Sequence, residues 1–374
     1  MIKILTNNKG KIIKMKKLLL STALTGAIIT TSAIAQTQIP GNMTVGLRAT
    51  SEKSATAGSN SASGSKRGML AETQLNVQNK GKLNNGLDYA AGFALEFDAN
   101  ETTSTGSTHG RSIANENTFI DLISGGTTVS FSIDHMNDFD RSMAPRVGEH
   151  GAGTGANGGV TASTKLLADP LNTAAAYGLN VRQAFPGIGQ ITLGYNPTAT
   201  CSSTNAQGCG GSDTAVTEGD EGSAYSALLE LPNLGGIKGL NVEAGIVEQQ
   251  KKISSTSSPA RDAEFTTIGA NYTVGPVSFG YNKKEFTSGK SALEKQVQDD
   301  FGISYTQGNL SYGFLYQKVD SNLATVVDEK YKAIAIGYNL GPVAAMLNVA
   351  SHEDVAGVPG NDADSITIKL RTSF

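Results

Sequence analysis

The feature that most constrains the fold is a strict alternation of apolar and polar residues along the chain. The apolar parity of residues 87–99 is filled by Leu87, Tyr89, Ala91, Phe93, Leu95, Phe97 and Ala99. The last eleven residues repeat the pattern, with Ile366, Ile368, Leu370 and Phe374 on one parity. A period of two places alternate side chains on opposite faces of a strand. The pattern therefore predicts strands with one apolar and one polar face.

This alternation recurs often enough to predict sixteen strands, an even number. The expected ranges are 42–50, 68–78, 87–99, 115–124, 127–134, 176–185, 190–196, 223–231, 238–248, 264–274, 276–283, 298–306, 309–318, 330–340, 342–350 and 364–374. Tight turns such as Gly275-Pro276 and Gly341-Pro342 alternate with longer polar stretches, the longest being 135–175. Short turns at one end and long loops at the other are typical of a transmembrane antiparallel β-barrel. A β-sandwich would have connections of more even length.

Composition supports a barrel with a polar interior. Only 39% of the 374 residues are hydrophobic. This hydrophobic content is low for two packed cores and too low for repeated apolar helices of about 20 residues. In a barrel, only alternate strand residues need to be apolar. Tyr and Phe near the strand ends are expected to form the interfacial girdles, because the chain has no Trp.

Residues 1–35 are predicted to be a secretory signal peptide, leaving 36–374 as the barrel domain. The segment has six Lys and no acid, then an apolar stretch, and it ends in Ala33-Ile34-Ala35 before Gln36. A membrane anchor is the alternative, and residues 1–14 could be a start-site artefact, since Met15 opens a more ordinary signal. Without six of its 30 basic residues, the chain has 24 against 33 acidic ones, a net charge of −9. An acidic mature protein argues against a nucleic-acid partner.

The leader, the hairpin rhythm, the terminal strand ending in Phe374 and one long loop after the fifth strand together resemble a known family. Over residues 40–374 the chain is similar to the Gram-negative outer-membrane porins of the sixteen-strand, general-diffusion type. This resemblance implies an outer-membrane location, contact with membrane lipid, a homotrimer, and a third loop folded into the pore. Phe374 is expected to act as an assembly signal at the end of the closing strand.

No enzymatic machinery is expected. The four histidines, His109, His135, His150 and His352, lie in predicted loops or at a strand end, and no Gly-x-Ser-x-Gly motif is present. They are interpreted as solvated loop residues. The Gly-rich stretch 151–159 lacks the Gly-Lys-Ser/Thr of a phosphate-binding loop.

Two features of the predicted loops could form a disulfide bond or bind a metal ion. Cys201 and Cys209 are close together in a Gly/Ser/Asn-rich stretch, and in an exported chain this favours a disulfide. A zinc site is the rival, but two cysteines without a nearby histidine supply too few ligands. The acidic run of Asp213, Glu218, Asp220 and Glu221 either binds Ca²⁺ or is simply solvated. No other cofactor or metal is expected.

The charges expected to face the lumen divide into two groups. The apolar residues flanking the Gly-rich middle of 135–175 suggest that this loop packs on something, by resemblance the inner wall. It would present its carboxylates, Asp138, Asp140, Glu149 and Asp169. Arg48, Lys369 and Arg371 would line the facing wall at roughly similar heights on neighbouring strands, with Arg182 added. Charged rings set selectivity in pores, although such residues could merely solvate a wide lumen.

Three functions fit this pattern. The first is a water-filled channel for passive diffusion of ions and small hydrophilic solutes. The second is a substrate-specific channel, and the third is a structural or adhesin-type barrel whose loops bind a partner. Small polar residues on the lumen parity, such as Ser130, Ser132 and Thr192, favour an open channel. That parity is poor in aromatics, whereas sugar-selective channels often have an aromatic slide. The preferred solute does not follow from the sequence.

Overall fold

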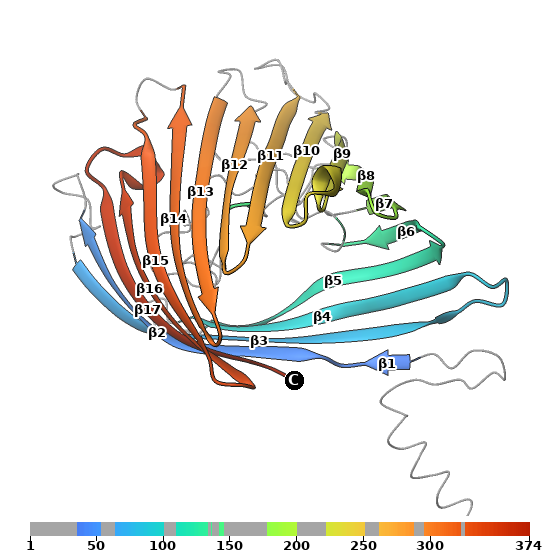
Figure 1. Ribbon diagram of the computed structural model, residues 1–374, viewed down its shortest axis with the longest axis horizontal. Coiled ribbons are helices and arrows are strands. Elements are labelled where there is room, and N and C mark those ends of the chain that lie inside the picture. Colours follow the sequence, from blue (N-terminus) through green and yellow to red (C-terminus); the bar gives the residue numbers. More distant parts are fainter. Residues whose placement is uncertain are drawn as a thin grey trace, which may run out of the picture.

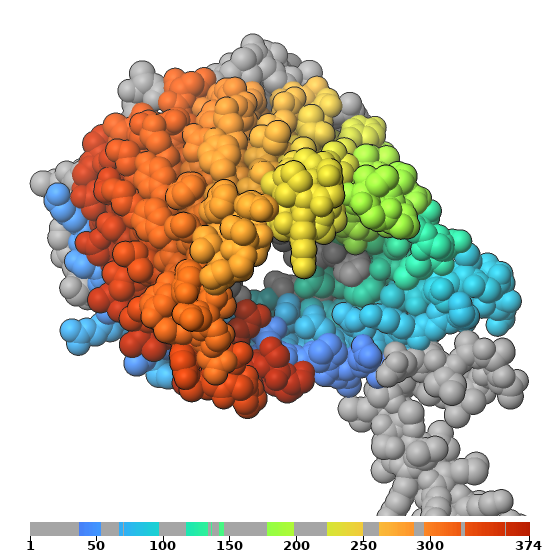
Figure 2. Space-filling view, viewed as in Figure 1, coloured from blue at the N-terminus to red at the C-terminus, as the bar shows by residue number. Residues whose placement is uncertain are grey.

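The computed structural model describes residues 36–53, 64–100, 110–133, 136, 142–145, 178–199, 222–250, 262–287, 295–322 and 326–374. These residues form one sheet of antiparallel strands rolled into a barrel (Figure 1). No helix of the described residues is long and apolar enough to cross a membrane. Figure 2 shows the opening inside the ring of strands.

The barrel wall is built of the sixteen strands β2–β17, so the predicted number is confirmed. Their bounds are β2 (Gly41–Lys53), β3 (Gly64–Lys82), β4 (Asp88–Asn100), β5 (Gly110–Ser124), β6 (Thr127–Ser132), β7 (Gly178–Phe185), β8 (Gly189–Ala199), β9 (Gly222–Leu231), β10 (Leu240–Gln250), β11 (Ala263–Val274), β12 (Val277–Thr287), β13 (Lys295–Gln307), β14 (Leu310–Ser321), β15 (Glu329–Asn339), β16 (Val343–Glu353) and β17 (Asp362–Ser373). Most run past the predicted ranges at the end with the long connections. An extra short strand, β1 (Gln36–Gln38), pairs with β3 and was not predicted.

The barrel closes between its last and first strands. β17 pairs with β2 over their whole lengths, from Asp362 opposite Lys53 to Ser373 opposite Asn42. Phe374 continues the ladder, because its N–H donates to the Gly41 carbonyl at 2.9 Å and its own carbonyl accepts from the Gly41 N–H at 2.7 Å. The Phe374 ring packs over Gly41, where an added Cβ would lie 2.6 Å from the ring and would make it turn aside. The closing strand thus lies where its sequence placed it.

The two faces of the wall have opposite chemistry. Outward residues of the predicted apolar parity are exposed, among them Leu47, Ile334 and Ile366 at 51–61%. The girdle candidates Tyr195, Tyr281, Tyr305 and Tyr338 are also exposed on this face. Inward residues are buried and mostly small or polar, as at Ser130, Asn180 and Thr192. This is the arrangement of a barrel with lipid outside and a polar lumen inside.

In the part of the chain that the structure describes, two short 3-10 helices lie in connections between strands. Helix η3 (Leu234–Gly236) lies between β9 and β10, and helix η4 (Val355–Gly357) lies between β16 and β17. Val355 and Ala363 form a small buried cluster beside η4. The η4 segment also contacts the connection between β14 and β15, since the Val327 N–H donates to the Gly357 carbonyl at 3.0 Å. The ends of β14–β15 and β16–β17 are thereby tied together.

Candidate functional site

A stripe of basic side chains runs along the seam where the barrel closes. Arg48 on β2 and Lys369 on β17 are inward and only 8% and 5% exposed, and Arg371 shares their face. Arg48 lies opposite Thr367, and its Nε donates to the Thr367 hydroxyl at 3.2 Å. We call Arg48, Lys369 and Arg371 the basic seam.

The register corrects the expectation that these three side chains lie at similar heights. Thr367 is the partner of Arg48, so Lys369 is one inward position further along β17 and Arg371 is two. Each inward position advances about 7 Å along an antiparallel strand. The basic seam is therefore a ladder of basic side chains along the inner wall.

Arg182, the fourth predicted base, has a different role. It lies on β7 with its side chain on the inward face, where Nε donates to the Thr192 hydroxyl at 3.1 Å. Its Nη2 donates to the backbone carbonyl of Met136 at 2.9 Å. Met136 belongs to the long connection between β6 and β7 and is 5% exposed. Arg182 thus holds the start of this connection against the wall.

The described residues 142–145 of the same connection lie against the inner wall of β11–β13. They rest on inward glycines, which we call the glycine seat: Gly269, Gly280 and Gly302. A Cβ at Gly280 would lie 2.4 Å from the Met143 carbonyl oxygen, and one at Gly302 would lie 2.6 Å from that of Pro145. The Met143 N–H donates to Asn282 Oδ1 at 3.4 Å. This segment therefore lies inside the barrel.

Buried acids lie on the wall that carries the glycine seat. Glu243 on β10 is 1% exposed and pairs across the sheet with Gly269. Asp300 on β13 is fully buried, and its Oδ1 accepts from Gln317 Nε2 at 2.9 Å and also from Gln298 Nε2. Asp300 is not among the charges that the sequence led us to expect in the lumen. The alternation could have identified Asp300 as inward, because it has the same parity as Gly302 and the opposite parity to Phe301.

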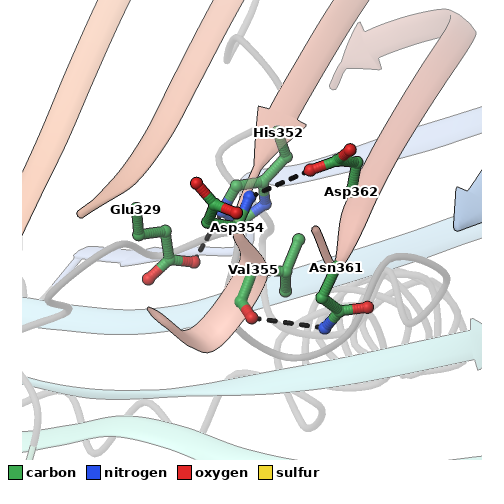
Figure 3. A network of polar contacts seen from close by, with 6 residues as sticks. All are labelled: Glu329, His352, Asp354, Val355, Asn361 and Asp362. Carbon is green, nitrogen blue, oxygen red and sulfur yellow. Dashed lines mark hydrogen bonds and ion pairs between the residues drawn. The ribbon is translucent and has the colours of Figure 1, made fainter. Parts of the chain in front are cut away.

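His352 is not a solvated loop residue, so that interpretation was wrong. It lies within β16, is 2% exposed, and its Nε2 is 2.5 Å from Glu329 Oε1 of β15 (Figure 3). Its ring also packs edge-on against Tyr331, with ring centroids 5.8 Å apart. Nearby, the Asp354 N–H donates to Asp362 Oδ1 at 3.2 Å. His352 therefore fastens β15 to β16 at their long-loop ends.

Several predicted residues lie outside the described part of the chain, and their roles stay predictions. They are the loop carboxylates Asp138, Asp140, Glu149 and Asp169, the pair Cys201 and Cys209, the acidic run 213–221, and His109, His135 and His150. The expected signal peptide, 1–35, lies outside it as well. Within the ranges that the structure describes, no three His, Cys, Asp or Glu side chains are placed to hold a metal ion.

Comparison with known proteins agrees with this architecture. Solved structures of similar fold include an anion-selective porin from Comamonas acidovorans, at 13% identity and TM-score 0.60 over 91% of this chain and 100% of that one. OmpF of Salmonella typhi, in complex with daunomycin, matches at 13% identity and TM-score 0.62 over 91% of this chain and 98% of that one. The trimer form of OmpT from Vibrio cholerae matches at 12% identity and TM-score 0.56 over 91% and 99%.

At the level of sequence, a search of curated proteins finds no significant match. The model of the Gram-negative porin family, however, matches residues 21–369, nearly the whole chain. Family and fold thus agree with each other and with the barrel geometry described above. The chain belongs to the Gram-negative porins.

Proposed function

We propose that this porin is an outer-membrane channel for passive diffusion whose passage runs between the basic seam and the long β6–β7 connection. The observation that carries the proposal is the position of residues 142–145, which rest on Gly269, Gly280 and Gly302 inside the barrel. A loop held inside the lumen narrows the passage. Ions and small hydrophilic solutes would pass through what remains.

The two sides of this passage differ in charge. Arg48, Lys369 and Arg371 project from β2 and β17, whereas Glu243 and Asp300 lie on the wall that seats the loop. Asp138 and Asp140 directly precede the seated segment in sequence and would add to the acidic side. In a confined passage such charges are weakly screened and would orient dipolar solutes. With a net charge of −9 on the mature chain, we propose a mild preference for cations.

The next observations concern the assembly of the protein and the functions that compete with a diffusion channel. One Vibrio cholerae relative is described in a trimer form, which supports a homotrimer here. The Comamonas relative is named as anion-selective, but at 13% identity the fold is shared and the lumen charges need not be. The buried, small inward residues Ser130 and Ser132 favour an open channel over an adhesin-type barrel with a filled lumen. A catalytic role has no support in the motifs.

Planar-bilayer recordings in a salt gradient test the proposal. The double variant Asp138→Asn/Asp140→Asn should shift the reversal potential towards anions, and Arg48→Gln/Lys369→Gln should shift it towards cations. A unit charge at 4 Å contributes about 1 kcal/mol in water, so the permeability ratio should change a few-fold. Lys283→Gln/Lys295→Gln is the control, since these lysines pair with the outward carboxylate of Glu285. Selectivity that stays unchanged in both lumen variants would disprove the assignment.

A further inference from the structure

A hollow of about 640 Å³ lies beside residues 142–145, at the short-turn ends of β7–β11. Ser142 and Met143 border it on one side, and the β7–β8 turn and the β9–β10 connection border it on the others. Asn271 also lines it and is one inward position beyond Gly269 towards the short turn after β11. Short turns face the periplasm in barrels of this kind. The hollow is therefore on the periplasmic side of residues 142–145, and we call it the periplasmic hollow.

The periplasmic hollow is acidic. Glu230 of β9 has the inward parity and lines it, and its Oε2 accepts a hydrogen bond from Gln190 Nε2. Directly opposite Glu230 across the sheet is Glu243 of β10, which is also inward and 1% exposed. None of the residues that line the hollow, all of which the structure describes, is basic. Two acids facing each other on neighbouring strands repel, so the hollow favours a cation over an anion or a neutral molecule.

The other lining residues are of two kinds, amide and apolar. Asn241 Nδ2 donates to Asn271 Oδ1 at 2.8 Å, and Asn271 Nδ2 is 3.9 Å from Met143 Sδ. The apolar residues that line the hollow beside Met143 are Phe185, Ile188, Leu231, Pro232 and Val242. A volume of this size is within the range of small-molecule sites, about 300–1,000 Å³. One carboxylate beside an apolar surface suits a cation that is attached to a hydrocarbon group.

We propose that the periplasmic hollow binds a small primary amine that carries an aromatic or alkyl group, with its ammonium at Glu230 and its apolar group against Met143, Ile188 and Leu231. The inference rests on the proposed function, because it names a class of solute that is held on the periplasmic side of the same passage. A carboxylate accepts several hydrogen bonds, and an ammonium has three donors. Glu230 can therefore bind the amine while it keeps its bond from Gln190. A neutral solute of the same shape is the rival, and it would gain the apolar contact alone.

The chain has no Trp, so a single introduced Trp reports on one place alone. Ile188→Trp puts the reporter at the hollow, and Leu340→Trp, in the short β15–β16 turn and 56% exposed, is the matched control. Each full-length variant is folded into phosphatidylcholine vesicles and titrated with para-bromophenethylamine or its neutral analogue, para-bromophenethyl alcohol, because bromine quenches Trp fluorescence. Heat-modifiable gel migration confirms folding, and Phe185→Trp replaces Ile188→Trp if the latter fails to fold.

We expect saturable quenching of Ile188→Trp, with the amine binding roughly tenfold more tightly than the alcohol, the gain from a hydrogen bond to a charged group. At Leu340→Trp, quenching should follow only the partition of each probe into the bilayer and should not saturate. Adding Glu230→Gln should remove the preference for the amine. Adding Glu248→Gln should leave the preference unchanged, since Glu248 is an exposed acid on the outer face of the same β10 strand.

Three results would overturn the proposal: equal affinities for the two probes, a preference for the amine that survives Glu230→Gln, or quenching that is the same at both reporters. Conductance of the parent protein in potassium chloride is recorded in parallel. A channel that conducts normally but does not bind the amine would refute this site alone, whereas a protein without conductance would refute the proposed function.

Discussion

The sharpest test of the architecture is to replace glycines of the glycine seat by a larger residue. In the double variant Gly280→Ala/Gly302→Ala, each new methyl group meets the backbone of residues 142–145. The Met143 carbonyl oxygen would lie 2.4 Å from one Cβ, and ordinary contact begins at 3.4 Å, so it must move by about 1.0 Å. The Pro145 carbonyl, at 2.6 Å, must move by about 0.8 Å. The wall behind the methyl groups is a hydrogen-bonded sheet, so the segment moves towards the lumen axis.

This displacement has an energetic and a functional consequence. Overpacking a well-packed site costs about 1–3 kcal/mol, so the free energy of unfolding, from urea titration in lipid vesicles, should fall by at least about 1 kcal/mol. Single-channel conductance should fall too, because the segment protrudes further into the passage. The matched control is Ser278→Ala/Ser304→Ala, since these residues pair with each other across the same two strands, one inward position away from the Gly280–Gly302 pair. The control should keep both values close to those of the parent.

Two results would refute the reasoning. If the glycine variant and the serine control have the same stability and conductance as the parent, residues 142–145 do not rest on this wall. If conductance rises while stability falls, the segment has left the wall, and the assumption that Arg182 and Asn282 keep it in place is wrong. Either result would remove the observation on which the proposed passage depends.

Three further predictions concern assembly, the loop cysteines and the outer ends of the strands. Deleting Phe374 should sharply lower the yield of the folded, heat-modifiable form, because two hydrogen bonds to Gly41 are lost. The variant Phe374→Tyr should keep the yield of the parent, and a normal yield after the deletion would contradict the prediction. Unreduced, denatured protein should titrate no free thiols at Cys201 and Cys209, and two thiols would exclude the disulfide. His352→Phe should destabilise the barrel by about 1–3 kcal/mol, since it removes the partner of Glu329, whereas His352→Gln should recover part of the loss; equal stabilities of both variants and the parent would show that the contact contributes nothing.

The strands and their faces could be predicted because the information is local. Alternation fixes which side of each strand faces outward, so Ile366, Ile368 and Leu370 were assigned correctly without any knowledge of pairing. The relative heights of residues on different strands, in contrast, are not set by local sequence. The staggering of Arg48, Lys369 and Arg371 depends on the register between the first and last strands, which the residue pattern of either strand alone does not specify. β1 was missed because Gln36–Gln38 has no apolar residue to alternate.

His352 shows how a small error in a boundary changes a chemical interpretation. The predicted strand stopped at residue 350, because Ser351, His352 and Glu353 are polar and resemble a loop. In the barrel, β16 continues to Glu353, since an inward polar residue is as acceptable as an apolar one when the lumen is wet. An alternation rule that looks for apolar residues ends the strand too early at this end. The same cause explains why most strands exceed their predicted ranges towards the long connections.

The glycine seat could not be read from the sequence, and it explains the asymmetry of the lumen. Gly280 and Gly302 have the polar parity, where glycine simply looks like a small residue lining an open channel. Their neighbours across the sheet are each other, so two adjacent strands lack side chains at one height. A gap of this kind in a wall lets another backbone approach closely, and residues 142–145 occupy it. The long basic side chains lie on other strands, at the seam of β2 and β17. One part of the wall thus holds residues 142–145 and another carries the basic side chains, and we propose that solutes pass between the two.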